Sequence, residues 1–260
     1  MTQPVGLASA WHPRGEEERF ERLLPVLSEV YAGLAITLPP GQDSLAARLS
    51  VFTGVHPYVT SRWPEGRWRS LELAQGLGGS HVHYVDFDRL LRWVETRPAE
   101  WRQCVERLTR HDCLIIGRTP AAYATHPAAL VQTEAISNLV VSNLLGQVVD
   151  ASAGAKGFSR AAVECLLRRT RPERALGADG EWPLTLFHAG FVVDYMEVDG
   201  LDWEIPDQYR AEAANPDRQQ AVAQAYDQDP ARWAHRVQVA HEIVQAGLEA
   251  DRRGRQNENR

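Results

Sequence analysis

The feature that most constrains the fold of this sequence is an alternation of short apolar runs with segments of helical spacing in its first half. Apolar runs cover 31–38, 56–61 and 81–85, and amphipathic segments at 44–52 and 67–77 lie between them. Short apolar runs bounded by turn residues are typical of buried strands, and strands that alternate with helices form parallel sheets. The sequence therefore predicts an α/β fold with a mostly parallel mixed sheet flanked by helices.

The remaining segments extend this pattern. The first residues look like a loose arm before a helix at 16–30, and small or polar residues predict loops at 151–157 and 171–181. Further strands are expected at 112–116, 148–149 and 191–198. Further helices are expected at 89–109 with a break near Pro98, at 127–145, at 160–169 with Ser159 as N-cap, at 206–214 and at 230–253.

Composition and charge exclude several classes of protein. The 260 residues carry 28 basic and 34 acidic side chains, and the net charge of −6 argues against a general nucleic-acid binder. No apolar run approaches the roughly 18–20 residues that span a bilayer, and the first residues lack the pattern of a secretory signal. Three widely spaced cysteines form neither a disulfide framework nor a zinc knuckle. We expect a cytoplasmic protein without a membrane span.

The stretch that points most directly to chemistry is Asp86-Phe87-Asp88, which follows the predicted strand at 81–85. Two carboxylates two residues apart on an extended chain point to the same side and repel each other. Mg²⁺ or Mn²⁺ relieves that repulsion and leaves coordination positions open for substrate phosphates. Two acidic residues also suit the first turn of a following helix, whose dipole favours negative charge. The triplet by itself leaves both interpretations open.

The order of motifs around this D-x-D triplet resembles that of the GT-A nucleotide-sugar glycosyltransferases, family-2-like and similar to glycosyl- and mannosylglycerate synthases. Residues 66–89 combine a basic residue, a helix, a glycine break, a strand and the triplet. ITLPP at 36–40 is similar to the family's first strand. DASAGAKGFSRAA at 150–162 is similar to its small-residue loop and acceptor-side helix, and ADGEWPL at 178–184 to its acidic acceptor segment. The likeness covers 30–204.

The resemblance implies a divalent ion, Mg²⁺ or Mn²⁺, held by the D-x-D triplet and bound to the donor diphosphate. It implies that Asp88 is the direct ligand, and that Asp86 contacts the ribose or, through water, the metal. His188 in LFHAG is the best-placed third ligand, with a hydrogen-bonded histidine in a packed segment as the alternative. Arg67 or Arg69 adds a cation near the phosphates. The metal would offset the charge that develops on the leaving nucleoside diphosphate.

The donor nucleobase is expected at the turn after the family's first strand. Ligands of open α/β sheets bind beyond the carboxyl ends of the strands. Pro39 and Pro40 follow one predicted strand, and Ser61 and Arg62 follow the next. We therefore assign these four residues to donor binding.

The catalytic base of an inverting enzyme is expected at Asp179 or Glu181, with Trp182 beside it as a platform for the acceptor. Members of the family often carry an adjacent acidic pair here, whereas Gly180 separates the two acids in this sequence. Both acids also suit a solvated loop. Without a base, a retaining mechanism remains, so the stereochemical outcome is left open.

The resulting functional prediction is a metal-dependent glycosyltransferase that moves a sugar from a nucleotide-diphosphate sugar to a hydroxyl of a small molecule or glycan. We expect no nucleic-acid partner and allow for a homodimer. A sugar-phosphate nucleotidyltransferase is the first alternative, although it normally has a glycine-rich basic loop after its first strand, and 39–43 contains no lysine or arginine. A non-catalytic nucleotide-sugar-binding protein of the same fold is the second.

The sequence contains no clear linker and no internal repeat. Its last residues, RRGRQNENR, have the composition of a solvated tail. We predict a GT-A nucleotide-diphospho-sugar transferase domain at 1–205, followed by a C-terminal helical extension with a disordered tail at 206–260.

Overall fold

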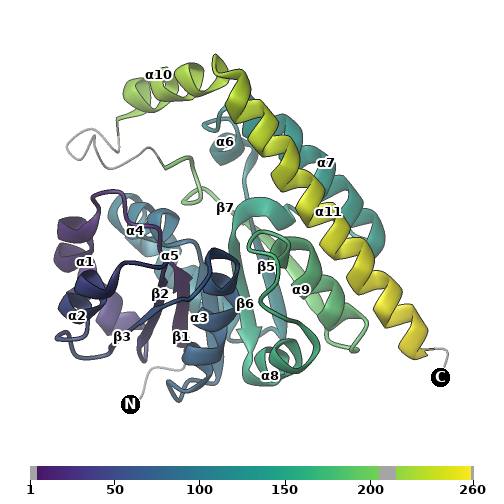
Figure 1. Ribbon diagram of the computed structural model, residues 1–260, viewed down its shortest axis with the longest axis horizontal. Coiled ribbons are helices and arrows are strands. Elements are labelled where there is room, and N and C mark those ends of the chain that lie inside the picture. The colour runs from purple at the N-terminus through teal and green to yellow at the C-terminus, as the bar shows by residue number, and fades with distance from the viewer. Residues whose placement is uncertain (1–4, 205–214, 259–260) are drawn as a thin grey trace.

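The computed structural model describes residues 5–204 and 215–258. A seven-stranded sheet with the order β3-β2-β1-β4-β6-β5-β7 forms its centre (Figure 1). Neighbouring strands are parallel except around β6, which is antiparallel to both β4 and β5. The predicted mostly parallel mixed sheet is therefore confirmed. The strands are β1 (Val5–Ala10), β2 (Leu34–Leu38), β3 (Val55–Val59), β4 (His81–Val85), β5 (Cys113–Arg118), β6 (Ala155–Ser159) and β7 (Val193–Val198).

Helices cover both faces of the sheet (Figure 1). They are α1 (Glu17–Val30), α2 (Asp43–Leu49), α3 (Gly66–Gln75), α4 (Phe87–Thr96), α5 (Pro98–Leu108), α6 (Pro120–Tyr123), α7 (Ala128–Leu145), α8 (Arg160–Arg169), α9 (Ala178–Phe187), α10 (Pro216–Asp227) and α11 (Pro230–Glu258). Two short 3₁₀ helices, η1 (Trp63–Glu65) and η2 (Ala151–Ala153), complete the described elements.

The core is divided by the sheet into two apolar layers. In β5, Leu114 and Ile116 pack into the layer that contains α1, α4 and α5, whereas Cys113 and Ile115 pack into the layer that contains α7, α8 and α9. Alternate residues of a strand face opposite sides of the sheet, so a strand buried on both faces is apolar throughout. This explains why β2 and β5 appear in the sequence as continuous apolar runs.

The expected loose arm at the N-terminus is wrong, because Val5–Ala10 forms β1 in the middle of the sheet. Small residues such as Gly6 and Ala8 make this strand hard to recognise, since they have low strand propensity. Helix α3 packs on this strand, and a Cβ on Gly6 would lie in ordinary contact distance, 3.5 Å, of the carbonyl oxygen of Ala74. The strand that ends at Leu38 is therefore the second strand of the sheet, not the first.

Two predicted loops and one predicted strand also differ from the structure. The small-residue loop at 151–157 contains η2 and most of β6, whose residues pair with β4 and β5. The polar loop at 171–181 ends at 177, because α9 begins at Ala178. Val148 and Val149 belong to no strand. Helix α9 was hidden by Gly180 and Pro183, which are poor helix formers.

The long C-terminal helix packs on the helices of the sheet domain. Helix α11 runs along α7 and α9 (Figure 1) and continues to Glu258, five residues beyond the predicted end at 253. The predicted helix at 206–214 and the predicted domain boundary after 205 lie outside the described residues. None of the described helices has both the length and the apolar character needed to span a bilayer.

Helices α9 and α11 approach each other through glycines. A Cβ on Gly180 would lie 2.5 Å from the carbonyl oxygen of Ile243 and 3.2 Å from the backbone nitrogen of Gly247. Real Cβ atoms do not approach backbone atoms this closely, so the two helices would have to separate to accommodate a side chain. The small residue at this position lets α11 cover the sheet domain.

We predict that Gly180→Ala destabilises the protein by about 1–3 kcal/mol, which lowers the melting temperature by several degrees, because the added methyl group forces α9 and α11 apart. Differential scanning calorimetry measures the change. The matched control is Gly76→Ala, at the exposed C-cap of α3 with φ of −73°, where alanine is tolerated. A Gly180→Ala variant as stable as the parent would contradict the close helix crossing.

Candidate functional site

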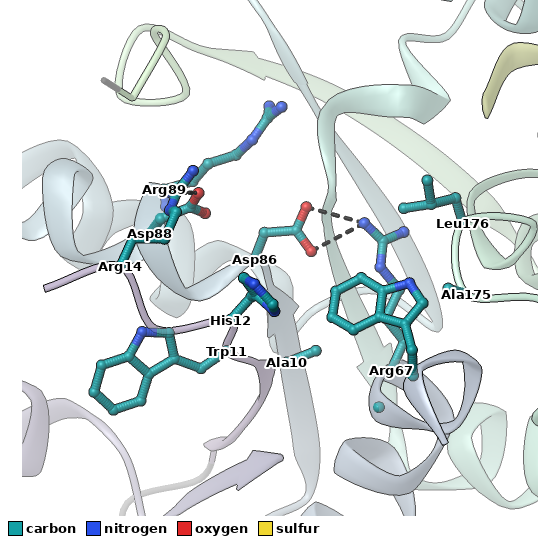
Figure 2. A pocket seen from close by; sticks show the side chains of 12 residues that line it. Ala10, Trp11, His12, Arg14, Arg67, Asp86, Asp88, Arg89, Ala175 and Leu176 are labelled. Atoms are coloured by element: carbon teal, nitrogen blue, oxygen red, sulfur yellow. Dashed lines mark hydrogen bonds and ion pairs between the residues drawn. The ribbon is translucent and has the colours of Figure 1, made fainter. Parts of the chain in front are cut away.

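A cavity of about 230 Å³ lies at the carboxyl ends of β1 and β4, in the middle of the sheet (Figure 2). It is built by the segment after β1, by η1 and the start of α3, by the junction between β4 and α4, and by the segment before α9. The lining residues are Ala10, Trp11, His12, Arg14, Trp63, Gly66, Arg67, Asp86, Asp88, Arg89, Ala175 and Leu176. Both carboxylates of the D-x-D triplet are in this set, and so are three arginines.

The triplet is placed by the end of β4. Asp86 keeps an extended backbone and its N–H donates to the carbonyl of Gly154 at 3.0 Å, so the strand pairing reaches this residue. Helix α4 begins at Phe87, and its first turn contains Asp88. Gly154 has φ of +73°, and a Cβ there would lie 2.4 Å from Oδ2 of Asp86. The glycine in the small-residue loop is therefore required for the carboxylate to occupy its position.

Asp86 points toward α3, where it meets a buried arginine (Figure 2). Nη2 of Arg67 donates to both carboxylate oxygens of Asp86 at 3.0 Å, and the hydroxyl of Tyr84 donates to Oδ1 at 2.8 Å. Burial raises the pKa of Asp86 above its ordinary value, and the charge of Arg67 opposes this shift without cancelling it. The carboxylate is held in one orientation at the floor of the cavity.

Asp88 belongs to a second group of charges on the other side of the cavity (Figure 2). Arg14 forms an ion pair with Asp88, and the backbone N–H of Arg89 donates to Oδ1 of Asp88 at 2.8 Å. Burial alone would raise the pKa of Asp88, but Arg14 and Arg89 outweigh it, so the pKa lies below its ordinary value. Asp88 is therefore ionised at neutral pH.

Behind Asp86, a chain of buried charges extends into the core. Nη1 of Arg67 donates to Asp179 at 2.9 Å, and Nζ of Lys156 donates to the same carboxylate at 2.5 Å. Asp179 and Lys156 are 3% and 0% exposed, so Asp179 lies in the interior rather than in a solvated loop. Burial would raise the pKa of Asp179, but Arg67 and Lys156 lower it to about 2. The arrangement keeps Asp179 as an anion that orients Arg67.

The two carboxylates of the triplet are the candidate ligands of a divalent ion, and each is already paired with an arginine, Asp86 with Arg67 and Asp88 with Arg14. Their side chains keep 23% and 30% exposure, and both face the cavity. Mg²⁺ and Mn²⁺ sites of this kind use one or two carboxylates together with phosphate oxygens and water. Within residues 5–204 and 215–258, no group of three or more histidine, cysteine or acidic side chains has the geometry to hold a metal without such a substrate.

The structure does not bring His188, Glu181 or Trp182 to this cavity. His188 follows α9 and its Nε2 lies 3.0 Å from Oδ1 of Asp251 on α11, as in the alternative of a packed histidine. Glu181 forms an ion pair with Arg253 at 2.6 Å and lines a different hollow. Trp182 is 2% exposed in the core, so the prediction of an acceptor platform there is wrong.

The residues assigned to the donor nucleobase also lie outside the lining of the cavity. Ser61 and Arg62 both bond to Glu65 at 3.0 Å, which fixes the start of η1. Arg69 forms an ion pair with Glu72, whereas Arg67, the other arginine considered for the phosphates, lines the cavity. Pro39 and Pro40 follow β2, one strand away from the cavity, and remain a prediction.

Sequence reasoning missed the contribution of the segment after β1. Trp11, His12 and Arg14 line the cavity, and Arg14 is the ion-pair partner of Asp88. The signal was present in the sequence as a basic residue followed by Gly15, which has φ of +110° here. It was overlooked because β1 had not been recognised as a strand.

A second cavity, of about 560 Å³, adjoins the first. The two share Arg14, Asp88 and Arg89, so the D-x-D triplet lies at their junction. Its other walls come from α10, α11 and the segment after β7, with Trp203, Glu204, Tyr226, Arg232, His235 and Arg236 among the lining residues. Burial raises the pKa of Glu204 to about 8, although Arg19 holds one of its oxygens at 2.7 Å.

The sequence matches no protein-family model and no curated protein. Among solved structures, glucosyl-3-phosphoglycerate synthase from Mycobacterium tuberculosis, in complex with Mn²⁺, UDP-glucose and phosphoglyceric acid, is similar with a TM-score of 0.50. The identity is 12%, over 85% of this chain and 79% of the synthase chain.

Two further structures from Mycobacterium tuberculosis have lower TM-scores. The same synthase in complex with UDP gives 0.46 at 13% identity, over 84% of this chain and 79% of that one. The protein Rv0371c gives 0.45 at 16% identity, over 82% of this chain and 100% of that one. The first similarity, together with the strand order, shows that this chain has a GT-A glycosyltransferase-like fold.

Proposed function

We propose that this chain is a glycosyltransferase that moves a sugar from a nucleotide-diphosphate sugar to a hydroxyl acceptor, with Mg²⁺ or Mn²⁺ at the D-x-D triplet. The observation that carries the proposal is the pair Asp86 and Asp88 at the end of β4, in one cavity with Arg14, Arg67 and Arg89. Two carboxylates for a metal and three arginines for phosphates match the charges of a metal-bound diphosphate. The similar synthase, which was solved with Mn²⁺ and UDP-glucose, supports this choice.

We assign the following roles to residues of this chain. Asp88 and Asp86 would hold the metal, which supplies positive charge to the leaving diphosphate when bound. Arg14 and Arg89 lie beside Asp88, where a guanidinium can bind phosphate oxygens through a planar fork. Arg67 is buried between Asp86 and Asp179, so its orientation is set before the donor arrives. Such preorganised charges stabilise a developing anion without rearrangement.

The second cavity is the proposed acceptor site. It meets the donor cavity at Asp88 and Arg89, so an acceptor within it lies next to the donor phosphates. Arg232, Arg236 and His235 line it, and Trp203 and Tyr226 add aromatic surface. Arginines recognise carboxylate and phosphate groups, and aromatic rings pack against apolar faces. We therefore propose a small acidic acceptor, in line with the phosphoglyceric acid bound to the similar synthase.

Asp179 and Glu181 remain the two proposed candidates for the catalytic base. Asp179 is nearer to the donor cavity, because it contacts Arg67, but its low pKa and its two cationic partners make it a weak proton acceptor. The pKa of Glu181 is raised by burial, which suits a base, yet its side chain lines another hollow. These properties favour a retaining reaction, which needs no dedicated base, over an inverting one.

A sugar-phosphate nucleotidyltransferase is the second candidate, and one observation favours it. The segment 39–43, which contains no lysine or arginine, follows the second strand rather than the first. The loop after the true first strand contains Arg14 and Gly15, and Arg14 lines the cavity. That class of enzyme normally has a glycine-rich basic loop at this place, and this loop supplies one basic residue and one glycine.

One pair of assays separates the candidates. A glycosyltransferase releases a nucleoside diphosphate from nucleotide sugars, whereas a nucleotidyltransferase releases pyrophosphate from a nucleoside triphosphate and a sugar phosphate. We expect diphosphate release with a panel of nucleotide sugars and 3-phosphoglycerate as the first acceptor. Pyrophosphate release alone would select the second candidate, and nucleotide binding without either reaction would indicate a non-catalytic binding protein.

A homodimer and a cytoplasmic location remain predictions. The surface best suited to pairing is the outer side of α7, where Ile136 and Leu139 are 58% and 62% exposed, with the 86% exposed Val148 beyond the end of the helix. Glu134 is the single charged residue of α7, and it is buried. Surfaces that combine apolar side chains with few charges are typical of subunit interfaces.

We predict that nucleoside diphosphates bind about tenfold more tightly with Mn²⁺ than in excess chelator, and that Asp88→Asn abolishes this difference, because the amide is a poor metal ligand. Isothermal titration calorimetry measures both affinities. Asp43→Asn, at an exposed position on α2, is the matched control and should retain the metal dependence. Equal affinity with and without metal in the parent protein would refute the metal site.

We predict that Asp179→Asn lowers the free energy of unfolding by about 3 kcal/mol, because Arg67 and Lys156 lose their shared buried anion. Glu181→Gln, whose partner Arg253 is half exposed, should change it by less than about 1 kcal/mol. Urea denaturation at pH 7 measures both. Because the folded pKa of Asp179 is depressed, its contribution is present above about pH 4 and is lost as the pH falls toward 2.

The same two variants test the base. If one of the acids removes the acceptor proton, its amide variant should lose two to four decades in turnover while donor binding is kept. If both variants fold and turn over like the parent, neither acid is the base.

A further inference from the structure

A second positively charged hollow is lined by the segment 170–174, just before the two residues of the same segment that line the donor cavity. The C-terminal end of α8, this segment and the last turns of α11 enclose a space of about 290 Å³. An adjoining space of about 390 Å³ shares Arg169 and Arg253 with it. We call the two together the arginine groove. It is distinct from both cavities that meet at the D-x-D triplet, because it shares no lining residue with them.

Five arginines from different elements line the groove: Arg168, Arg169, Arg171, Arg174 and Arg253. Two of them are neutralised by carboxylates. Arg174 donates two hydrogen bonds of 2.9 Å to Glu249, and Arg253 donates one of 2.6 Å to Glu181. Glu173 is the third acid of the lining, so five arginines against three carboxylates give it a net positive charge in a chain of net charge −6.

Arg168, Arg169 and Arg171 form no ion pair with any carboxylate in the part of the chain that the structure describes. The dipole of α8 favours two of them, because cations are stabilised near a helix C-terminus. It does not account for Arg171, which lies beyond the helix. Bringing like charges together from separate elements is unfavourable unless an anion joins them.

We propose that the arginine groove binds a small phosphorylated molecule, with Arg168, Arg169 and Arg171 as its principal ligands. The planar guanidinium fork matches the oxygens of a phosphate group and binds two of them at once. The groove is a recessed hollow of a few hundred Å³ and not a flat surface. This volume admits a small molecule that carries one or two phosphate groups. This inference is independent of the proposed transfer reaction.

The position of the groove links it to the donor cavity. Arg174 lines the groove, and the next two residues, Ala175 and Leu176, line the donor cavity. The backbone N–H groups of Leu176 and Gly177 are fixed to Glu242 on α11 at 2.9 and 3.0 Å. An anion held by Arg171 therefore contacts the same segment that forms part of the wall of the donor cavity.

The test is pyrophosphate binding in excess chelator, measured by isothermal titration calorimetry on the full chain. The double substitution Arg168→Gln with Arg169→Gln should weaken binding at least tenfold. Its matched control is Arg107→Gln with Arg110→Gln, two exposed arginines at the end of α5 and just beyond it, which makes the same change in net charge.

Two results would overturn the proposal. One is a parent protein that binds no pyrophosphate in the millimolar range. The other is a groove variant, with an unchanged melting temperature, that binds pyrophosphate as the parent does, because the anion would then occupy the donor or acceptor cavity. Neither result bears on the release of nucleoside diphosphate in the transfer assay, so the two proposals fail separately.

Discussion

The candidate site depends on a buried arginine shared by two carboxylates. Arg67 joins Asp86 at the cavity floor to Asp179 in the core, and Asp179 in turn holds Lys156. The charges of this buried row alternate in sign, so each one is compensated by its neighbours. An unpaired charge at the same depth would carry a large desolvation penalty. Because α3, β4, β6 and α9 each contribute one member, the relative positions of these four elements are fixed at the point where the cavity forms. The orientation of the D-x-D triplet follows from that packing.

The junction of the two cavities explains why the segment after β1 matters as much as the triplet. Arg14 and Arg89 lie on either side of Asp88, and all three face both hollows. A group transferred from one cavity to the other would pass this cluster of charges. Its net positive charge suits a reaction in which negative charge accumulates on a leaving phosphate, whether that phosphate belongs to a nucleotide sugar or to a nucleoside triphosphate.

Much of the fold was predictable from the sequence, and the failures have physical causes. Strand β4 was found with its correct bounds because Val82, Tyr84 and Val85 make it apolar on both faces. Strand β1 was missed because Gly6 and Ala8 have low strand propensity. Strand β6 was missed because it contains Gly157, where a Cβ would lie 2.7 Å from Cβ of Leu108. Tertiary packing, not local propensity, decided these segments.

The site was only partly predictable for the same reason. Asp86 and Asp88 were identified because they directly follow a strand that the local pattern reveals. The partners of Asp179 come from α3 and β6, more than twenty residues away in sequence, and no local pattern reports such a contact. His188 was predicted to turn toward the triplet, but its partner is supplied by α11, the helix whose packing on the sheet domain could not be foreseen.

Lys156 is the only lysine of the chain, and its amine is sealed beneath α9 by Asp179 and the carbonyl oxygen of Ala151. A reagent that acylates side-chain amines finds no reactive lysine on the folded surface. It gains one only when α9 lifts away from β6 and breaks the contact with Asp179. The rate at which Lys156 becomes acylated therefore measures how often α9 separates from β6. Mass spectrometry can follow this rate without any engineered label.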